Sequence, residues 1–229
     1  MIAAAVVLLA APSPADAAVP CGDADWAWYF DGVYEQPASS AYAARATIRE
    51  RNIALCSNAS GVTAGALAWT MLTDSTYSGY AQIGYAEYPA YTTTRRFWEY
   101  NDGEGWWNRL RFADIAAGTD HVYEVVYSFT YGTVGMLVDG SLKQTTPFSI
   151  EFGEWPTPWQ GQWMGETWDR GDDVPGTSTA KARFGSVGVV VQRAGPYVNP
   201  RNVGTVQSLT VYKFQWVSQP TVFNIWTQR

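Results

Sequence analysis

The sequence predicts an all-β fold, an antiparallel two-sheet jelly-roll sandwich. Short runs rich in Val, Ile, Tyr, Trp and Thr alternate with clusters of Gly, Pro, Asn and Asp, which is the pattern of strands separated by turns. No helical segments with βαβ spacing occur between these runs, so a sandwich or barrel of antiparallel strands is expected. No internal repeat, charge block or low-complexity linker divides the chain, which indicates one domain.

Ten segments have strand character. They are 26–34, 66–72, 79–88, 95–100, 108–112, 121–129, 133–138, 159–168, 184–192 and 206–217. Asp139-Gly140 follows an apolar strand and is typical of a two-residue hairpin turn leading into Ser141-Leu142-Lys143. Segment 41–53 is open, because its Ala and Arg content favours a helix whereas its alternating apolar residues favour a strand. We expect a strand there.

The N-terminus has the pattern of a secretory signal peptide. An apolar run over 2–11 leads into Pro12-Ser13-Pro14 and the small-residue triplet Ala15-Asp16-Ala17. The run is too short for a helix that spans a bilayer of about 30 Å, and no later stretch has the roughly 20 apolar residues that a span needs. We therefore expect a signal peptide over 1–17, one β-sandwich domain over 18–229, a secreted protein and no membrane partner.

Charge and cysteine content narrow the function classes. A net charge of −6 argues against nucleic acid, whose phosphates need a basic surface. Cys21 and Cys56 are the two cysteines, and in an exported chain they predict one disulfide, with two separate thiols as the alternative. Twelve Trp and fourteen Tyr either fill the core of the sandwich or line a groove that binds sugars or extended peptides.

Several kinds of catalytic site are excluded by the residues available. The single histidine, His121, follows a turn at the start of a strand and is expected at the surface, so a Ser-His-Asp triad or a histidine-based zinc site is disfavoured. No phosphate-binding or dinucleotide motif occurs, and we expect no cofactor. Asp169, Asp172 and Asp173 could hold a calcium ion, but a solvated turn is the favoured interpretation. Any chemistry must come from carboxylates, amides and water.

Two polar residues in the middle of predicted strands are the candidate catalytic residues. Period-two alternation places Gln82 on the strand face that carries Tyr80 and Gly84, and Glu166 on a face with Met164 and Trp168. A carboxyl group between Met and Trp side chains is partly desolvated, which raises its pKa. The alternative is that both residues lie on solvated faces of their strands.

Short motifs in a fixed order resemble those of a known family. They are Ala68-Trp69, Asp74, Ala81-Gln82-Ile83-Gly84, Trp98-Glu99-Tyr100, Gln162-Trp163-Met164-Gly165-Glu166 and Phe184-Gly185-Ser186-Val187. Their order is similar to that of the glutamic peptidases, or eqolisins, which are secreted acid endopeptidases with a concanavalin-like jelly roll. In that family a strand beginning Ala-Trp leads through an acidic turn to the catalytic Gln, and the catalytic Glu ends a Glu-Trp-Ile-Val-Glu strand. The segment 82–89 bears a looser similarity to the neprosins.

The resemblance implies roles for specific residues. Gln82 and Glu166, 166 − 82 = 84 positions apart, would be the catalytic pair. Other residues of the motifs would form the substrate groove or support it: Trp69, Trp98, Glu99, Tyr100, Gln162, Trp163 and Trp168. Alternation places Trp98 and Tyr100 on the strand face opposite to Glu99, so these cannot all face a substrate. Gln162 stands where the family has the first Glu of its strand, and Asn101-Asp102 replace a proline.

Two functions from different classes follow. The first is hydrolysis of a polypeptide substrate at acid pH, in which Glu166 takes a proton from a water and returns it to the leaving amine while Gln82 holds the water and the oxyanion. The second is a carbohydrate-binding, lectin-like jelly roll without catalytic activity, because aromatic faces stack on sugar rings. The segment 121–140 resembles a strand pair of concanavalin-like lectins and glucanases, but the glucanase cluster Glu-x-Asp-x-x-Glu is absent. A structural envelope protein without a ligand is a third alternative, and a monomer is expected.

Overall fold

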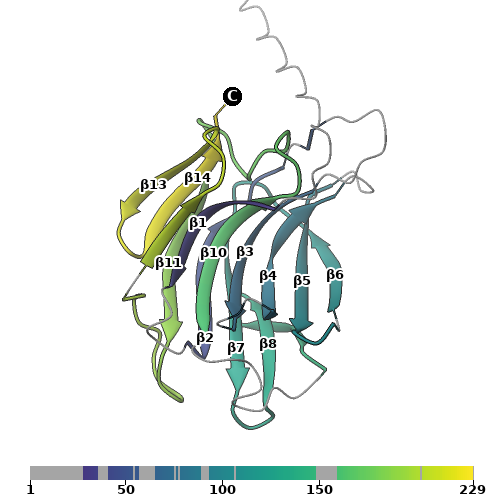
Figure 1. Cartoon of the computed structure of the whole chain (residues 1–229), viewed down its shortest axis with the longest axis vertical. Coiled ribbons are helices and arrows are strands. Elements are labelled where there is room, and N and C mark those ends of the chain that lie inside the picture. The colour runs from purple at the N-terminus through teal and green to yellow at the C-terminus, as the bar shows by residue number, and fades with distance from the viewer. Residues whose placement is uncertain are drawn as a thin grey trace, which may run out of the picture.

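The computed structural model describes residues 28–35, 41–53, 55–56, 65–74, 76, 78–88, 93–105, 107–147, 159–201 and 203–228. Within these ranges the chain forms fourteen strands and no helix (Figure 1). The strands are β1 (Tyr29–Glu35), β2 (Ala43–Arg49), β3 (Ala66–Thr73), β4 (Gly79–Glu87), β5 (Arg95–Asp102), β6 (Trp107–Asp114), β7 (Asp120–Ser128), β8 (Thr133–Val138), β9 (Ser141–Thr145), β10 (Gln160–Thr167), β11 (Ala182–Val190), β12 (Val203–Gln207), β13 (Tyr212–Ser218) and β14 (Val222–Thr227). The predicted all-β fold is therefore confirmed.

The strands form two antiparallel sheets of seven strands each, stacked as a sandwich (Figure 1). The first sheet has the order β12-β1-β10-β3-β4-β5-β6, and the second has the order β13-β14-β11-β2-β7-β8-β9. Strands that are distant in sequence are neighbours in the first sheet, because β10 lies between β1 and β3. Because of this crossover, only β3 lies between β10, which carries Glu166, and β4, which carries Gln82.

The main core lies between the two sheets. Alternate residues of β4, namely Ala81, Ile83 and Tyr85, are fully buried and meet residues of the second sheet such as Ile48 and Tyr123. The alternation predicted for β4 is therefore correct, since Gln82 lies on the opposite face of the sheet from these three side chains. Burial of this apolar area at roughly 25 cal/mol per Å² supplies the main driving force for packing the sheets.

A second cluster covers the outer face of the first sheet, the face turned away from the second sheet. Its fully buried or nearly buried members are Leu67, Trp69, Ala86, Tyr88, Phe97 and Met164, and partly buried Phe30, Tyr34, Met71, Trp168 and Val206 pack against them. A sheet face that only meets solvent carries mainly polar residues. Gln82 and Glu166 thus lie among aromatic side chains, and the alternative of plain solvated faces does not describe them.

The boundaries of the strands differ from the predicted ones in a few places. Segment 41–53 contains a strand, β2, as expected. The predicted strand over 206–217 is two strands, β12 and β13, separated by a turn at Leu209, and β14 was not predicted. The hairpin at Asp139-Gly140 is present, and both residues have positive φ (50° and 72°), as a type I′ turn requires.

Two expectations, the leader and the disulfide, concern the N-terminal part of the chain. The predicted signal peptide over 1–17 and Cys21 lie outside the described residues, so the leader and the Cys21–Cys56 disulfide stay predictions. Among the residues that the structure describes, no helix is long and apolar enough to cross a bilayer.

Candidate functional site on the outer face of the first sheet

A polar row crosses the outer face of the first sheet. In the register of the sheet, Gln162 lies opposite Met71, Met71 opposite Gln82, Gln82 opposite Glu99, and Glu99 opposite Arg109. Residues directly opposite each other in antiparallel strands project from the same face. Gln82 therefore has Glu99 as its immediate neighbour on one side, and Gln162 is the residue of β10 that shares its row.

Glu166 projects from the same face but does not share that row. Glu166 lies opposite Leu67, and Leu67 lies opposite Ala86, four positions along β4 from Gln82. Strands about 4.8 Å apart and a rise of about 3.4 Å per residue give a separation of the two Cα atoms of about 10 Å across the sheet and about 14 Å along it. Trp69 projects from β3 between them, and no hydrogen bond between described groups joins Gln82 to Glu166.

Two indole groups hold the carboxyl group of Glu166. Nε1 of Trp69 donates to Oε2 at 2.9 Å, and Nε1 of Trp168 donates to Oε1 at 2.8 Å. Burial among these rings raises the pKa of Glu166 to about 7, although both indole hydrogen bonds act in the opposite direction. The charge of Glu99 raises this pKa further, while Arg109 lowers it. Glu166 is thus a carboxyl group whose proton is exchangeable near neutral pH, a property shared by many catalytic acids and bases.

Gln82 presents a hydrogen-bond acceptor that has no donor. The side chain is only 5% exposed, and its Oε1 atom is buried and receives no hydrogen bond from any group that the structure describes. A buried amide oxygen without a donor costs about 1–3 kcal/mol. Such a cost is common where a ligand supplies the missing donor, which makes Gln82 a candidate for holding a ligand N–H or O–H group.

Glu99 and Arg109 form the supporting network of the site. Oε1 of Glu99 accepts hydrogen bonds from Tyr80 Oη and Trp107 Nε1, both at 2.6 Å, and Oε2 accepts one from Arg109 Nε at 2.6 Å. The guanidinium of Arg109 also lies 4.8 Å from the ring centre of Trp168 and 5.0 Å from that of Trp107. Arg109 therefore links the satisfied carboxylate Glu99 to one of the rings that hold Glu166.

The remaining residues of the resemblance fall into two groups. Gln162 belongs to the outer face, where its Nε2 donates to Gln160 Oε1 at 2.7 Å. Trp98, Tyr100 and Trp163 belong to the core between the sheets, so they are not walls of a groove on the outer face. They support the face from beneath, because alternation turns them away from it.

The resemblance did not indicate several residues of this face. Tyr80, Trp107 and Arg109 surround Glu99 and Trp168, yet they belong to none of the motifs. Tyr88, which contacts Arg109, belongs only to the segment that is similar to the neprosins. The alternation Trp107-x-Arg109, at the start of the strand predicted over 108–112, was the available signal. It could not be used without the register, which places these side chains beside Glu99.

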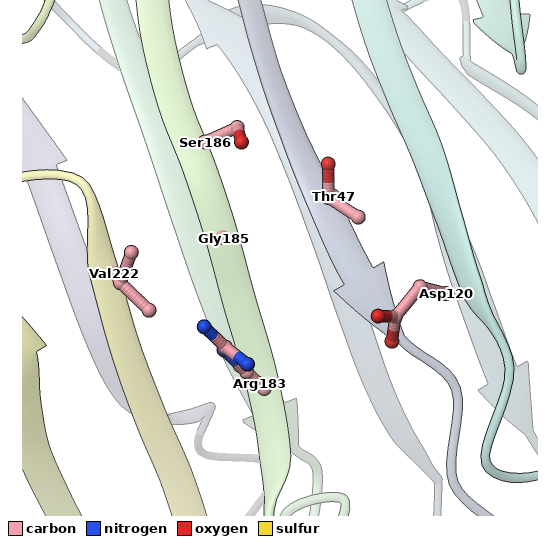
Figure 2. A pocket seen from close by; sticks show the side chains of 6 residues that line it. All are labelled: Thr47, Asp120, Arg183, Gly185, Ser186 and Val222. Carbon is pink, nitrogen blue, oxygen red and sulfur yellow. The ribbon is translucent and has the colours of Figure 1, made fainter.

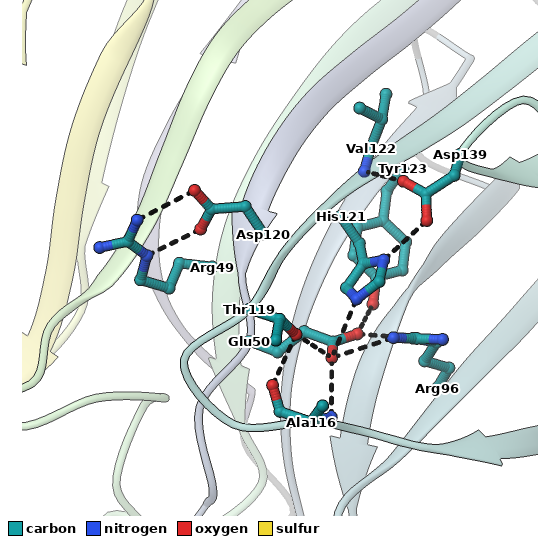
Figure 3. Close-up of polar contacts among 10 residues, drawn as sticks. All are labelled: Arg49, Glu50, Arg96, Ala116, Thr119, Asp120, His121, Val122, Tyr123 and Asp139. Carbon is teal, nitrogen blue, oxygen red and sulfur yellow. Dashed lines mark hydrogen bonds and ion pairs between the residues drawn. The ribbon is translucent and has the colours of Figure 1, made fainter.

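A separate polar cluster surrounds Glu50 at the end of β2 (Figure 3). Glu50 is fully buried and accepts hydrogen bonds from Arg96 Nε at 2.6 Å and Nη2 at 3.1 Å, from the Tyr123 hydroxyl and from the Ala116 backbone N–H at 3.2 Å. Arg96 belongs to the first sheet and Tyr123 to the second, so this cluster ties the two sheets together.

His121 lies at the edge of the Glu50 cluster. Its Nδ1 is 2.6 Å from Asp139 Oδ2, and its Nε2 is 3.9 Å from Glu50 Oε2. The side chain is 22% exposed, so the expected surface histidine is partly buried and has polar partners. No sequence pattern indicated this cluster.

The acidic segment that could have held calcium is a buried clamp. Asp172 is fully buried and accepts hydrogen bonds from the backbone N–H groups of Cys56 at 2.8 Å and Gly65 at 2.9 Å. Burial raises its pKa to about 6. The expectation of a solvated turn is therefore wrong for Asp172, and no group of three or more His, Cys, Asp or Glu side chains among the described residues is placed to hold a metal ion.

Comparisons with known proteins identify the class of fold. No protein-family model matches the chain, and no curated protein matches its sequence. The chain is an all-β, concanavalin-like jelly-roll sandwich, and its solved structural neighbours include a peptidase and glycoside-processing enzymes.

One of these solved structures is similar to most of the chain. It is scytalido-glutamic peptidase with a peptide-based transition state analog, with a TM-score of 0.61 and 15% identity over 87% of this chain and 98% of that chain. Apo Crh5 transglycosylase has a TM-score of 0.38 at 11% identity over 65% of this chain and 66% of its own. The β-glucanase of Bacillus licheniformis has a TM-score of 0.34 at 13% identity over 89% of this chain and 69% of its own. At these identities the similarity to the peptidase shows a shared fold.

Proposed function

We propose that this protein is a secreted acid endopeptidase of the glutamic type, which binds an extended polypeptide on the outer face of the first sheet. The observation that carries the proposal is Glu166, a carboxyl group held by two indole N–H groups with its pKa raised to about 7. The fold shared with a glutamic peptidase that was solved with a peptide-based transition state analog supports the choice of substrate class.

The raised pKa determines which proton transfer comes first. Between about pH 3 and 5 a group with a pKa of about 7 is protonated, so Glu166 begins the reaction as a general acid rather than as the base that the resemblance implies. Glu166 donates its proton toward the scissile amide as a water attacks the carbonyl carbon. The C–N bond then breaks, and a proton of the attacking water returns to Glu166.

The two indole groups have a role in this cycle. While Glu166 is ionised, its carboxylate accepts N–H hydrogen bonds from Trp69 and Trp168. Hydrogen bonds to a charged acceptor are worth about 1.5–3 kcal/mol. They stabilise the carboxylate during the step in which Glu166 has lost its proton, without a fixed positive charge that would keep it ionised in the resting state.

Gln82 is assigned to substrate positioning. Glu166 lies two strands and four positions away, so the two side chains act at different points along a bound peptide rather than on one water. An extended peptide rises about 3.4 Å per residue, so four or five residues cover the distance between them. The unpartnered Oε1 of Gln82 would accept a backbone N–H of that peptide.

The direct test is hydrolysis of unfolded casein by the purified protein between pH 3 and pH 8. General acid–base catalysis contributes about 10²–10⁴-fold, and Glu166→Gln should lose activity by that factor. The exposed carboxylate Glu104 provides a matched control, since Glu104→Gln should leave the rate unchanged. Activity that survives Glu166→Gln would rule out the proposed role of this residue.

A second measurement separates the two possible roles of Gln82. If Gln82 positions the peptide, Gln82→Ala raises KM and changes kcat little. A loss of kcat equal to that of Glu166→Gln would instead show that both residues act in the chemical step.

Carbohydrate binding without catalysis is the second candidate. Trp107 is 49% exposed beside Arg109 on the same face, and such a ring can stack on a sugar. In addition, the residue of β10 in the row of Gln82 is an amide, Gln162, and not a carboxylate. Binding to a glycan array that is lost in Trp107→Ala, together with no proteolysis at any pH, would favour this function over the peptidase.

Secretion is part of the proposal and has its own test. The N-terminal sequence of the protein recovered from the medium should begin after Ala17. If Cys21 and Cys56 are joined, the non-reduced mature chain should weigh about 2 Da less than the reduced chain, because forming a disulfide removes one hydrogen atom from each thiol. An intact Met1 on the recovered protein would contradict the leader.

A further inference from the structure

A small pocket opens on the outer face of the second sheet, on the side of the sandwich away from Gln82 and Glu166 (Figure 2). Its cavity volume is about 220 Å³, and it lies over β2, β7, β11 and β14. The lining residues are Thr47, Asp120, Arg183, Gly185, Ser186 and Val222. The pocket is therefore independent of the site proposed above.

Of the two charged residues that line the pocket, Asp120 has a counter-ion and Arg183 has none among the described groups. Both carboxylate oxygens of Asp120 are bound by Arg49, at 2.7 Å from Nε and 2.9 Å from Nη2. Chiefly through this hydrogen bonding, Arg49 lowers the pKa of Asp120, and Arg183 contributes to the shift. Arg183 itself makes no hydrogen bond or ion pair with the part of the chain that the structure describes. Its guanidinium is exposed in the pocket.

The surroundings of Arg183 are basic although the chain as a whole is acidic. Arg51 Nε donates to the backbone oxygen of Lys181, and Lys181 Nζ lies 4.0 Å from the ring centre of Trp226. Arg49, Arg51 and Arg183 thus all act on one carboxylate, Asp120, in a protein with a net charge of −6. A local positive field of this kind attracts an anion to the pocket.

Two hydroxyl groups complete the polar lining. Ser186 follows Gly185 at a β-bulge and has a φ of 50°, which is uncommon for a residue with a side chain. The bulge turns Ser186 outward, and Figure 2 shows Ser186 and Thr47 on neighbouring strands, with Gly185 between their hydroxyl groups and the Arg183 guanidinium. Val222 forms an apolar wall from β14.

We propose that this pocket binds a carboxylate group carried on a small organic ligand. A guanidinium pairs with a planar carboxylate through two parallel N–H hydrogen bonds. The hydroxyl groups of Thr47 and Ser186 line the same pocket and bind polar atoms of the rest of the ligand. Val222 contacts the carbon that carries the carboxylate. The pocket is smaller than the 300–1,000 Å³ of typical drug-sized ligand sites, so it holds one terminal group of a ligand.

The carboxylate can come from two sources, the C-terminus of a peptide or a uronic acid. The full chain is titrated with N-acetyl-L-alanine and with methyl galacturonide, followed by NMR or calorimetry. The uncharged N-acetyl-L-alaninamide and methyl galactoside are the matched compounds without the carboxylate. Sulfate tests whether any anion suffices. Binding by either carboxylate and by neither uncharged compound supports the proposal, and the tighter of the two identifies the source.

Variants locate the binding. Arg183→Gln should weaken carboxylate binding at least tenfold, and Thr47→Val should weaken it a few fold. Arg201→Gln, at an exposed arginine outside the pocket, should change nothing. The affinity should also fall as salt is raised. No saturable binding to the wild type, unchanged binding in Arg183→Gln, or sulfate binding as tight as that of both carboxylates would overturn the proposal. Glu166→Gln should bind the carboxylates normally, so a failed peptidase proposal would not affect this result.

Discussion

Glu50 and Glu166 are two shielded glutamates on opposite sides of the first sheet, and their partners differ. Glu50 faces the core, where Arg96 contacts both of its oxygens and Tyr123, Ala116 and Thr119 supply further donors. Glu166 faces outward, has two indole N–H donors and makes no ion pair with a described cation. Both carboxyl groups have hydrogen-bond partners, but only Glu50 has a cation in contact with it.

This difference separates a structural carboxylate from a reactive one. An ion pair with several added hydrogen bonds fixes a buried carboxylate in place. Indole donors without a contacting cation leave desolvation as the dominant influence, and the pKa of Glu166 rises to about 7. A proton can leave and return at Glu166 near neutral pH, whereas Glu50 holds the two sheets together.

Replacing Glu50 should give the largest loss of stability. Glu50→Gln removes a fully buried carboxylate and leaves the partly buried Arg96 without its counter-ion, and breaking a buried pair costs up to about 3–5 kcal/mol in the free energy of unfolding. Urea unfolding at pH 7 measures the loss. The exposed pair Arg49–Asp120 is the control, because Asp120→Asn should cost less than about 1 kcal/mol. Equal effects of the two substitutions would contradict a structural role for Glu50.

Asp31 extends the comparison to a carboxyl group with no hydrogen-bond partner among the described groups. It is fully buried, and neither oxygen accepts a hydrogen bond from the described groups. Burial raises its pKa from 3.8 to about 7, with Lys213 acting in the opposite direction. A group whose pKa is higher in the folded state stabilises the protein below its unfolded pKa. That stability is lost as the pH rises from about 4 to about 7.

Asp31→Asn should therefore remove a pH-dependent loss of stability. At about 1.4 kcal/mol per pKa unit, the variant should be about 2–4 kcal/mol more stable than the wild type at pH 8 and equal to it at pH 4. Thermal unfolding across this pH range is the measurement. Asp139→Asn is the control of opposite sign, because the pKa of Asp139 is lowered in the folded protein and its contribution is lost in acid. A variant that is no more stable at pH 8 than at pH 4, relative to wild type, would show that Asp31 is not the source.

The sequence predicted where strands lie and which residues share a face better than it predicted which strands pair with one another. Alternation in 79–88 placed Ala81, Ile83 and Tyr85 in the core and Gln82 outside it, because the period of a strand is set by local geometry. The same rule grouped Met164, Glu166 and Trp168 correctly on one face. The division of 206–217 into two strands was missed, since Ser208-Leu209-Thr210 has no Gly or Pro to mark the turn.

What alternation cannot supply is register and strand order. Those two properties make Gln162 and Glu99 the row neighbours of Gln82 and place Glu166 four positions away. They also bring Arg96 of the first sheet to Glu50 of the second, 46 positions earlier in the chain. Such contacts depend on how distant strands pair, and no short motif encodes them.

Replacing Glu166 should have the opposite effect on stability from replacing Glu50. In the wild type at pH 8 the carboxylate is ionised in a desolvated place, and Glu166→Gln removes that charge while its amide oxygen still accepts an indole N–H. The variant should be about 1–2 kcal/mol more stable at pH 8 and unchanged at pH 5. Chemical unfolding at the two pH values measures this. Stability lost at both pH values, as expected for Glu50→Gln, would place Glu166 among the structural carboxylates.

The smallest expected effect is the change in the pKa of Glu166 when one indole N–H group is removed. Trp168→Phe keeps a ring near Arg109 and Tyr88 but removes the N–H that donates to Glu166 at 2.8 Å. Because that hydrogen bond favours the ionised carboxyl, its loss should raise the pKa of Glu166 by about one unit. The pKa is measured from the carboxyl carbon of Glu166 by NMR, and Trp226→Phe on the second sheet is the matched control. An unchanged pKa in Trp168→Phe would mean that burial alone sets the proton affinity of Glu166, and the indole groups would then have no part in stabilising its ionised state.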